Sequence, residues 1–144
     1  MTDNSERPWI EGLAYLKTHE CLELLATREL GRVGFSVEDQ PVILPVNYRL
    51  IANAVVFRTD PGAKLSTALT RSVVAFEVDD VAPDGNSGWS VLVVGRATEL
   101  TDATSLQEAR QLNVSPWLPG SREHFVVIGA EQVSGRRFGA RVGE

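Results

Sequence analysis

The chain has 144 residues, of which 43% are hydrophobic and 23% charged, and its formal net charge is −5. These values are typical of one soluble globular domain, and an acidic chain lacks the basic face that a general nucleic-acid binder needs. No apolar run approaches the ~20 residues of a membrane span, and the acidic, polar residues 1–6 do not resemble a signal peptide. The lone cysteine, Cys21, cannot form an internal disulfide, so we expect a cytoplasmic protein.

The first predicted element follows an N-terminal extension at residues 1–17. It is a helix from His19 to about Leu30, with Thr18 as a candidate N-cap and Gly31 as a candidate C-terminal stop. Cys21 falls on the apolar side of this helix. We therefore interpret Cys21 as a core residue and not as a nucleophile.

After this helix, apolar and polar residues alternate, which is the period of half-buried β-strands. Turns at Glu38–Gln40 and Ala52–Asn53 separate the first three strands, and an acidic, glycine-rich loop separates the fourth from the fifth. Gly95, inside the long fifth strand, indicates a bulge or a close approach. A second helix, capped by Thr101 or Asp102, and a proline-rich loop precede the last strands. The predicted strands are residues 32–37, 41–48, 55–59, 73–78, 89–99, 124–128 and 132–138.

Six or seven short strands with two or three helices favour a mainly β fold, an antiparallel barrel with helices at its rim. Closure of the sheet removes the edges that so many strands would otherwise leave exposed. The dense apolar patterns at residues 73–78 and 91–94 exceed what the inside of one small barrel can bury. Outward members of these strands are therefore predicted to contact a symmetric partner in a homodimer.

Several hydrogen-bond donors converge where the third strand ends. Arg58 and Thr59 close the strand, residues 60–62 form a turn, and Lys64 lies at the start of a predicted short helix. A guanidinium, a hydroxyl, an ammonium and free helix amides together suit a phosphate group. An ordinary strand end with solvated charges has the same spacing, so both interpretations stay open.

The motifs of the chain occur in a characteristic order. They are Gly31-Arg32-Val33-Gly34, Leu44-Pro45-Val46-Asn47-Tyr48, Phe57-Arg58-Thr59 with Lys64, Gly88-Trp89-Ser90-Val91, Gly95-Arg96-Ala97 and Ser134-Gly135-Arg136-Arg137-Phe138. In this order they resemble the pyridoxamine 5'-phosphate oxidase-like family of FMN-binding split β-barrels, in its small actinobacterial branch. The resemblance runs from about Cys21 to Phe138, which implies a flavin-binding domain at residues 18–138 and a short tail at residues 139–144.

The resemblance implies that Arg58, Thr59 and Lys64 bind the FMN phosphate. Similar proteins are homodimers whose flavin sites lie between the subunits, and the partner contributes from the long strand after the acidic loop. Trp89 and Ser90 are the matching positions in this chain. For Trp89, core packing at the start of a strand is the alternative.

In similar proteins the second strand runs beside the isoalloxazine ring, and the matching residues here are Leu44, Pro45, Val46 and Asn47. Pro45 lacks an N–H, which suits a strand turned toward a ligand, although prolines are also common on edge strands without a ligand. For Asn47, a hydrogen bond to the ring and a role in closing a turn both stay open.

A flavin carries its own reactive atoms, so the protein has to supply orientation and electrostatics. We therefore expect an FMN-dependent oxidoreductase that acts on a small hydrophobic molecule, with its catalytic residues unassigned. The alternatives are a reductase using the 5-deazaflavin coenzyme and a non-catalytic flavin carrier or sensor.

Two further expectations concern what the chain does not do. True pyridoxamine phosphate oxidases are longer and carry a C-terminal substrate motif, so oxidation of vitamin B6 is not expected here. His19 and His124 lack the accompanying ligands of a metal site, and we interpret His124 as a satisfied surface histidine. The resemblance leaves the roles of Trp117, Arg136 and Arg137 unassigned.

Overall fold

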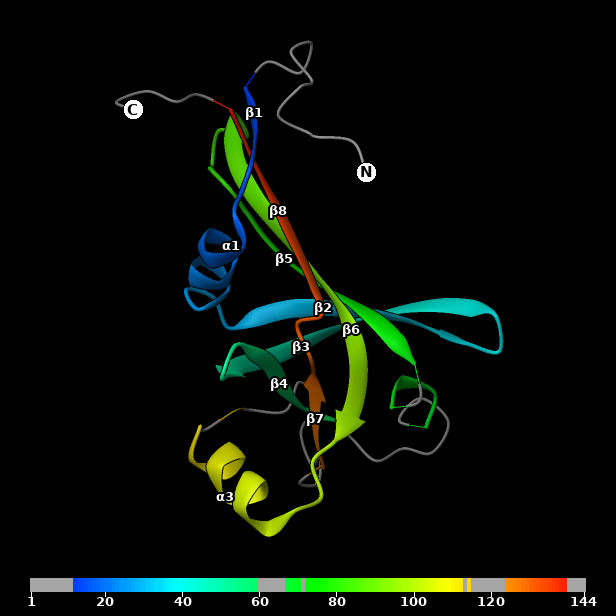
Figure 1. The fold of residues 1–144 in the computed structure, drawn as a ribbon. Helices are drawn as coiled ribbons and strands as arrows, with labels where there is room; N and C mark the ends of the chain where they lie inside the picture. Colours follow the sequence, from blue (N-terminus) through cyan, green and yellow to red (C-terminus); the bar gives the residue numbers. More distant parts are fainter. Residues whose placement is uncertain (1–11, 60–66, 71, 113, 115–123, 140–144) are drawn as a thin grey trace.

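The computed structural model describes residues 12–59, 67–70, 72–112, 114 and 124–139. Its centre is a closed antiparallel barrel of six strands, in the order β2-β3-β4-β7-β6-β5 and back to β2, which confirms the mainly β prediction (Figure 1). Two further strands, β8 and β1, extend the sheet beyond β6. The elements are β1 (Leu13–Tyr15), α1 (Thr18–Leu25), β2 (Leu30–Val37), β3 (Gln40–Ile51), β4 (Ala54–Thr59), β5 (Val73–Val81), β6 (Ser87–Glu99), α3 (Ala103–Gln111), β7 (His124–Ile128) and β8 (Gln132–Gly139).

Two tight turns connect β2 to β3 and β3 to β4. Glu38 and Asp39 have φ values of 50° and 67°, and Ala52 and Asn53 have values of 49° and 67°. Left-handed backbone at both central positions defines a type I′ turn, whose twist matches the twist of the strands it joins. Both turns lie where the sequence predicted them, although the first is one residue shorter because Gln40 already pairs in β3.

The first helix is shorter than the prediction of His19 to Leu30. Lys17, and not Thr18, is the N-cap residue, and its backbone N–H donates to Glu20 Oε1 at 2.8 Å. The helix ends at Leu25, and the chain has entered β2 by Leu30. The prediction was wrong here because the strand pairing of Leu30 with β3 overrides the helical propensity of the intervening residues.

Gly31, the predicted helix stop, is a strand residue. A Cβ at this position would come within 2.4 Å of the Phe76 ring, so the glycine makes room for that ring in the barrel core. Phe76 stands edge-on to Tyr48, with ring centroids 4.9 Å apart, and the Tyr48 hydroxyl donates to the Leu25 carbonyl at 2.5 Å. These contacts join the end of α1 to the barrel interior.

Half of the acidic loop predicted at residues 79–88 is strand. β5 continues to Val81 and β6 begins at Ser87, and Asp80 pairs in register with Trp89. Aspartate has a low intrinsic preference for strands, but the continuous pairing of two long neighbouring strands overrides it. The hairpin connection is therefore limited to residues 82–86.

α3 covers the outer side of β4 and β7. Val56, Ala109 and Phe125 form a small buried cluster there, separate from the barrel core. Asp102 is the N-cap residue of α3 and accepts the Ser105 N–H at 2.9 Å, which confirms one of the two predicted caps. None of the described helices is long and apolar enough to cross a membrane.

One edge of β6 changes its partner halfway along the strand. Its first half pairs with β8 and its last residues pair with β7. At the change, a Cβ on Gly95 would lie only 1.7 Å from the Gly129 carbonyl oxygen. At the same place the Arg96 N–H donates to Glu131 Oε2 at 3.0 Å. The predicted close approach at Gly95 is confirmed, and it marks the point where the barrel and the added sheet separate.

Replacing Gly95 by alanine should destabilise the protein by at least about 2 kcal/mol, because the new methyl group would meet backbone atoms that cannot rotate away. Gly34→Ala is a matched control in the same sheet, since the nearest atom to its added Cβ would be 3.9 Å away. Chemical denaturation of both variants measures the free energy of unfolding. Equal stability of the two variants would contradict the close approach.

Candidate functional site

Arg58 lies on the outer side of the barrel near the end of β4. Its guanidinium carbon is 5.6 Å from the centroid of the Phe125 ring, and Nη1 donates to the Val114 carbonyl at 3.3 Å. Its Nε is buried and has no hydrogen-bond partner in the part of the chain that the structure describes. A buried donor without an acceptor costs free energy, so this position suits an acceptor that comes from a ligand.

The other two members of the predicted phosphate cluster are Thr59 and Lys64. Thr59 pairs with His124 through the backbone of β4 and β7, but its side chain and the whole of Lys64 lie outside the described residues. His124 Nδ1 is 2.8 Å from Glu99 Oε2 at the surface, which confirms the interpretation of His124 as a satisfied surface histidine.

Sequence reasoning missed Phe125 and Val114 as neighbours of Arg58. Both are more than 50 positions away along the chain, as the separation of 56 residues between Arg58 and Val114 illustrates. The alternation of β4 predicts only that Arg58 points out of the barrel on the side of Val56. The segment that covers this side of β4 is set by the pairing of β4 with β7. The residues near Arg58 in the sequence do not indicate that pairing.

The first part of β3 has an unpaired edge. Residues Gln40–Asn47 pair with β2 on one side, whereas β4 pairs only with Tyr48–Ile51. No strand among the described residues pairs with the second edge of residues 40–47. Backbone N–H and C=O groups on such an edge can bind an extended or planar ligand. The stretch predicted to lie along a flavin, residues 44–47, falls within this edge.

The four predicted residues of β3 divide between two faces. Val46 is 6% exposed in the barrel core, and Leu44 packs against that core. Pro45 and Asn47 are half-buried and point outward, because strand residues alternate between faces. A ligand on the outside can therefore contact the side chains of Pro45 and Asn47, but only the backbone of the other two residues.

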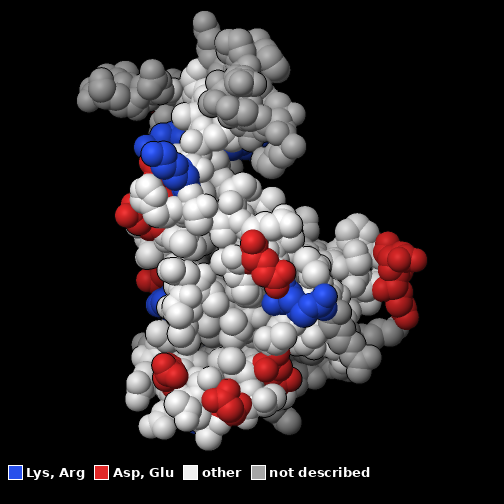
Figure 2. All heavy atoms as spheres, in the orientation of Figure 1, with Lys and Arg blue, Asp and Glu red and all other residues white. Residues whose placement is uncertain are grey.

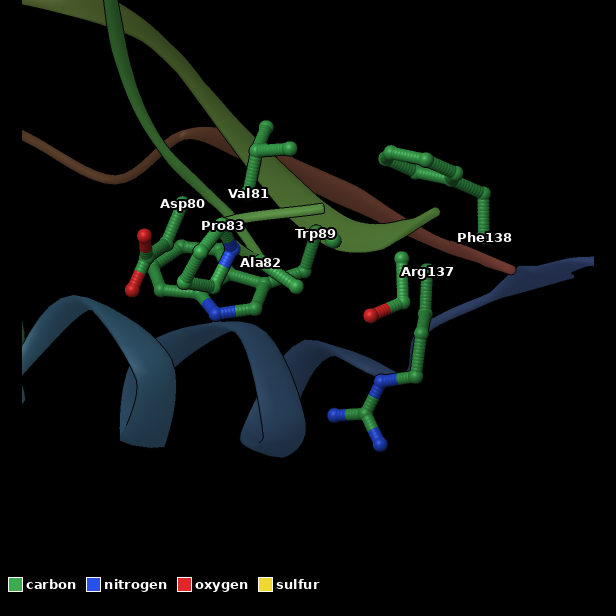
Figure 3. A pocket seen from close by; sticks show the side chains of 9 residues that line it. Asp80, Val81, Ala82, Pro83, Trp89, Arg137 and Phe138 are labelled. Carbon is green, nitrogen blue, oxygen red and sulfur yellow. The ribbon is translucent and has the colours of Figure 1, made fainter. Parts of the chain in front are cut away.

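Trp89 and Ser90 point to opposite faces of β6. Trp89 packs against the barrel core and extends toward α1 (Figure 3). The Arg28 guanidinium carbon lies 5.4 Å from its ring centroid. Ser90 faces outward, on the same side as Pro45 and Asn47. Within one chain neither residue approaches Arg58, because this half of β6 pairs with β5 and β8 and not with β4 or β7.

The outside of β2, β3, β5 and β6 carries exposed apolar side chains. The register places Ile43, Gly34, Ala75 and Val94 in one row across these four strands. Ile43 is 70% exposed and Val73 is 52% exposed. We use the term outer cluster for Ile43, Val73, Ala75, Leu92 and Val94.

Beside the outer cluster lies a carboxyl group with a shifted pKa. Glu77 pairs with Arg32 on β2 and with Leu92 on β6. The pKa of Glu77 is raised to about 7, mainly by burial and next by a hydrogen bond with Asp79. The positive charge of Arg32 opposes this shift only in part. The shift reflects a carboxylate that has too little solvation and too little positive charge in the folded chain.

Acidic side chains dominate two regions of the surface in Figure 2. One is the tip of the β2–β3 hairpin, with exposed Glu38 and Asp39, and the other surrounds α3, with exposed Asp102 and Glu108. α3 packs on the same strands that carry Arg58. An anion at Arg58 therefore depends on local donors, since the wider field of the acidic chain repels it.

Within the described ranges, no three His, Cys, Asp or Glu side chains are grouped so that they could hold a metal ion. The closed barrel with two added strands defines the chain as a split β-barrel protein. A family model for pyridoxamine 5'-phosphate oxidase matches residues 17–137. The chain belongs to this family, as the order of its motifs predicted.

The relatives include flavin-binding proteins and actinobacterial sequences. The uncharacterised protein Rv0080 of Mycobacterium tuberculosis is 38% identical over 128 residues, which cover 85% of this chain and 84% of Rv0080. An FAD binding protein from Mycobacterium smegmatis has a TM-score of 0.76 at 35% identity, covering 88% of this chain and 99% of its own. An FAD-binding protein from Mesorhizobium loti has a TM-score of 0.72 at 27% identity, covering 87% and 97%.

The raised pKa of Glu77 has a consequence for stability. Its folded pKa, about 7, lies above the ordinary value of 4.5, so the folded state binds the proton more tightly between these values. Stability from this group is present below pH 4.5 and is lost as the pH rises through about 7. Glu77→Gln should therefore raise the free energy of unfolding by about 1 kcal/mol near pH 8, allowing for partial exposure, and change it little near pH 4.

Denaturation of both proteins at several pH values measures this difference. Glu23→Gln is the control, because it makes the same chemical change at an exposed residue of α1, away from the contact of Glu77 with Asp79. A stabilisation by Glu77→Gln that is the same at low and high pH would contradict the assignment.

Proposed function

We propose that this protein binds a flavin and acts as a flavin-dependent oxidoreductase on a small hydrophobic molecule. The observation that carries the proposal is the buried Nε of Arg58, which has no hydrogen-bond partner among the described residues, in a chain whose solved relatives include proteins named as FAD-binding. A phosphate oxygen would supply the missing acceptor together with the opposite charge.

The environment of Arg58 fits this role. The Phe125 ring and the Val114 carbonyl hold the guanidinium in place but do not neutralise it. No carboxylate among the described residues forms an ion pair with Arg58, so within that part of the chain its charge is available to a ligand, and its orientation is set before the ligand arrives. In the proposed complex Arg58, Thr59 and Lys64 bind the phosphate.

The open edge of β3 fits the ring of the cofactor. Residues 44–47 would offer backbone groups to its polar edge, and Asn47 and Pro45 would face it with their side chains. A bound flavin supplies redox chemistry that no side chain provides, and the protein orients the ring and excludes water. Ile43 adjoins this edge and is 70% exposed, which is the reason for proposing a hydrophobic substrate.

We propose FMN as the cofactor, because the predicted donors form one cluster that suits one phosphate group. The absorbance spectrum of the purified protein tests this choice, since a flavin gives two visible bands and the 5-deazaflavin coenzyme a single band near the violet. Mass spectrometry of the released cofactor separates FMN from FAD. Reduction by candidate donors, followed by turnover, separates an enzyme from a flavin carrier or sensor.

Arg58→Ala should weaken FMN binding by about 2–4 kcal/mol, because a charge-assisted contact is lost and the phosphate is left under-neutralised. The FMN affinity of Arg58→Lys should lie between that of Arg58→Ala and that of the parent protein, because lysine keeps the charge but lacks the two parallel donors of arginine. Arg49→Ala is the matched control, a strand arginine whose partner is Glu29 at 3.1 Å. Unchanged FMN affinity of Arg58→Ala in calorimetry would place the phosphate elsewhere.

We also propose that two copies of the chain associate through the outer cluster. Contiguous exposed apolar side chains on a soluble protein mark contact surfaces, and a symmetric contact pairs such a patch with itself. Ser90 lies on the same outward face as Asn47 and Pro45. In the dimer, Ser90 of one subunit would therefore contribute to the flavin site of the other.

Val73→Glu should convert the dimer to a monomer at micromolar concentration, because it buries a charge in the proposed interface. Val81→Glu is the matched control. It changes the same residue type on the same strand at a similar exposure, 50% against 52%, but about 26 Å away. Sedimentation measures both variants, and a parent protein that is monomeric with flavin bound would rule out this interface.

A further inference from the structure

A pocket lies where β5, β6 and β8 end on the side remote from the outer cluster. Its volume is about 450 Å³, and its lining includes Trp89, Arg137, Asp80 and Pro83 (Figure 3). The proposed flavin site uses β3 and the end of β4, so this pocket needs a separate explanation.

Three side chains of the pocket stand in one row across the sheet. Asp80 pairs in register with Trp89, and Trp89 pairs with Arg137. Directly opposed residues of antiparallel strands have Cβ atoms about 4.5–5.5 Å apart, so the indole lies between a carboxylate and a guanidinium. Figure 3 shows the side chains of Trp89 and Arg137 both extending toward α1.

The charges of this row are not balanced. Asp80 forms an ion pair with Arg28, and that contact lowers the pKa of Asp80. Arg28 also lies over the Trp89 ring, at 5.4 Å from the centroid. Arg137 is exposed and forms no ion pair with any side chain that the structure describes. The pocket therefore presents one uncompensated guanidinium beside an aromatic wall.

We propose that this pocket binds a small aromatic anion, with its ring against Trp89 and Pro83 and its carboxylate on Arg137. The guanidinium offers two parallel donors that match a carboxylate, and the indole offers a flat surface for the ring. An uncharged aromatic molecule would leave Arg137 unpaired, and a bare inorganic anion would leave the aromatic wall uncovered. Because the whole chain carries a net charge of −5, the attraction for an anion has to come from this local guanidinium.

Calorimetry on the full-length, flavin-loaded protein tests the proposal with two probes of equal shape, 2-naphthoate and the neutral 2-naphthamide. The carboxylate should bind about tenfold more tightly than the amide, because it gains a charge-assisted contact. Arg137→Gln should abolish this difference. Arg136→Gln should retain it, because Arg136 pairs with Ser90 and faces the opposite side of β8. Trp89→Leu should weaken both probes to a similar extent.

Three results would overturn the proposal. Equal affinity of the two probes for the parent protein would show that the carboxylate charge does not contribute to binding. Equal losses of 2-naphthoate affinity in Arg136→Gln and Arg137→Gln would show that the carboxylate does not bind specifically at Arg137. Displacement of 2-naphthoate by FMN in flavin-free protein would make Trp89 part of the flavin site, as its motif suggested. Because the flavin site is tested at Arg58, failure of one proposal is distinguishable from failure of the other.

Discussion

The architecture depends on one close backbone contact, the approach of the Gly129 carbonyl to Gly95 in the middle of β6. A side chain at Gly95 would hold these segments apart, as the 1.7 Å distance to its hypothetical Cβ indicates. Only because they meet can β7 leave the edge of β6 and β8 take its place. One strand thus belongs to a closed barrel at one end and to an open sheet at the other, and both candidate binding sites follow from this division.

The barrel end carries the residues proposed for flavin binding. There the short overlap of β3 with β4 leaves the earlier part of β3 unpaired, and the β4–β7 pairing sets Arg58 against Phe125. The open-sheet end carries the row of Asp80, Trp89 and Arg137 under α1. The alternation of β6 separates the two, because Trp89 and its neighbour Ser90 face opposite sides of the same sheet.

Local sequence signals predicted the strands from β2 onward, the positions of both tight turns and Asp102 as one of two candidate caps of α3, since each depends on residues within a few positions. They did not predict β1, which lies in the residues assigned to an N-terminal extension. They failed where pairing between distant segments decides the outcome. Gly31 resembles a helix stop, but the ring of Phe76 requires a glycine there. Asp79 and Asp80 resemble a loop, but the long pairing of β5 with β6 keeps them in a strand.

The same distinction applies to the candidate site. Arg58 could be chosen from sequence because its chemistry suits phosphate, and the outward direction of its side chain follows from the alternation of β4. The identity of its neighbours could not be chosen, since Phe125 reaches it only through the β4–β7 ladder. The motif Gly88-Trp89-Ser90-Val91 does not show by itself which of its two central residues faces the core. That assignment depends on which face of β6 packs in the barrel, and Trp89 lies on that face.

Closure of the barrel also determines how the molecule opens. Strands β2 to β7 each have a neighbour on both sides for at least part of their length. Separating any two neighbours would therefore leave both strands with an unpaired edge. Backbone amides in the paired parts of this ring should exchange with solvent mainly through unfolding of the whole barrel. β1 has only three residues and, among the described strands, pairs only with β8, so its amides can exchange by local detachment. The sheet end of the molecule is therefore the part that can rearrange while the barrel stays folded.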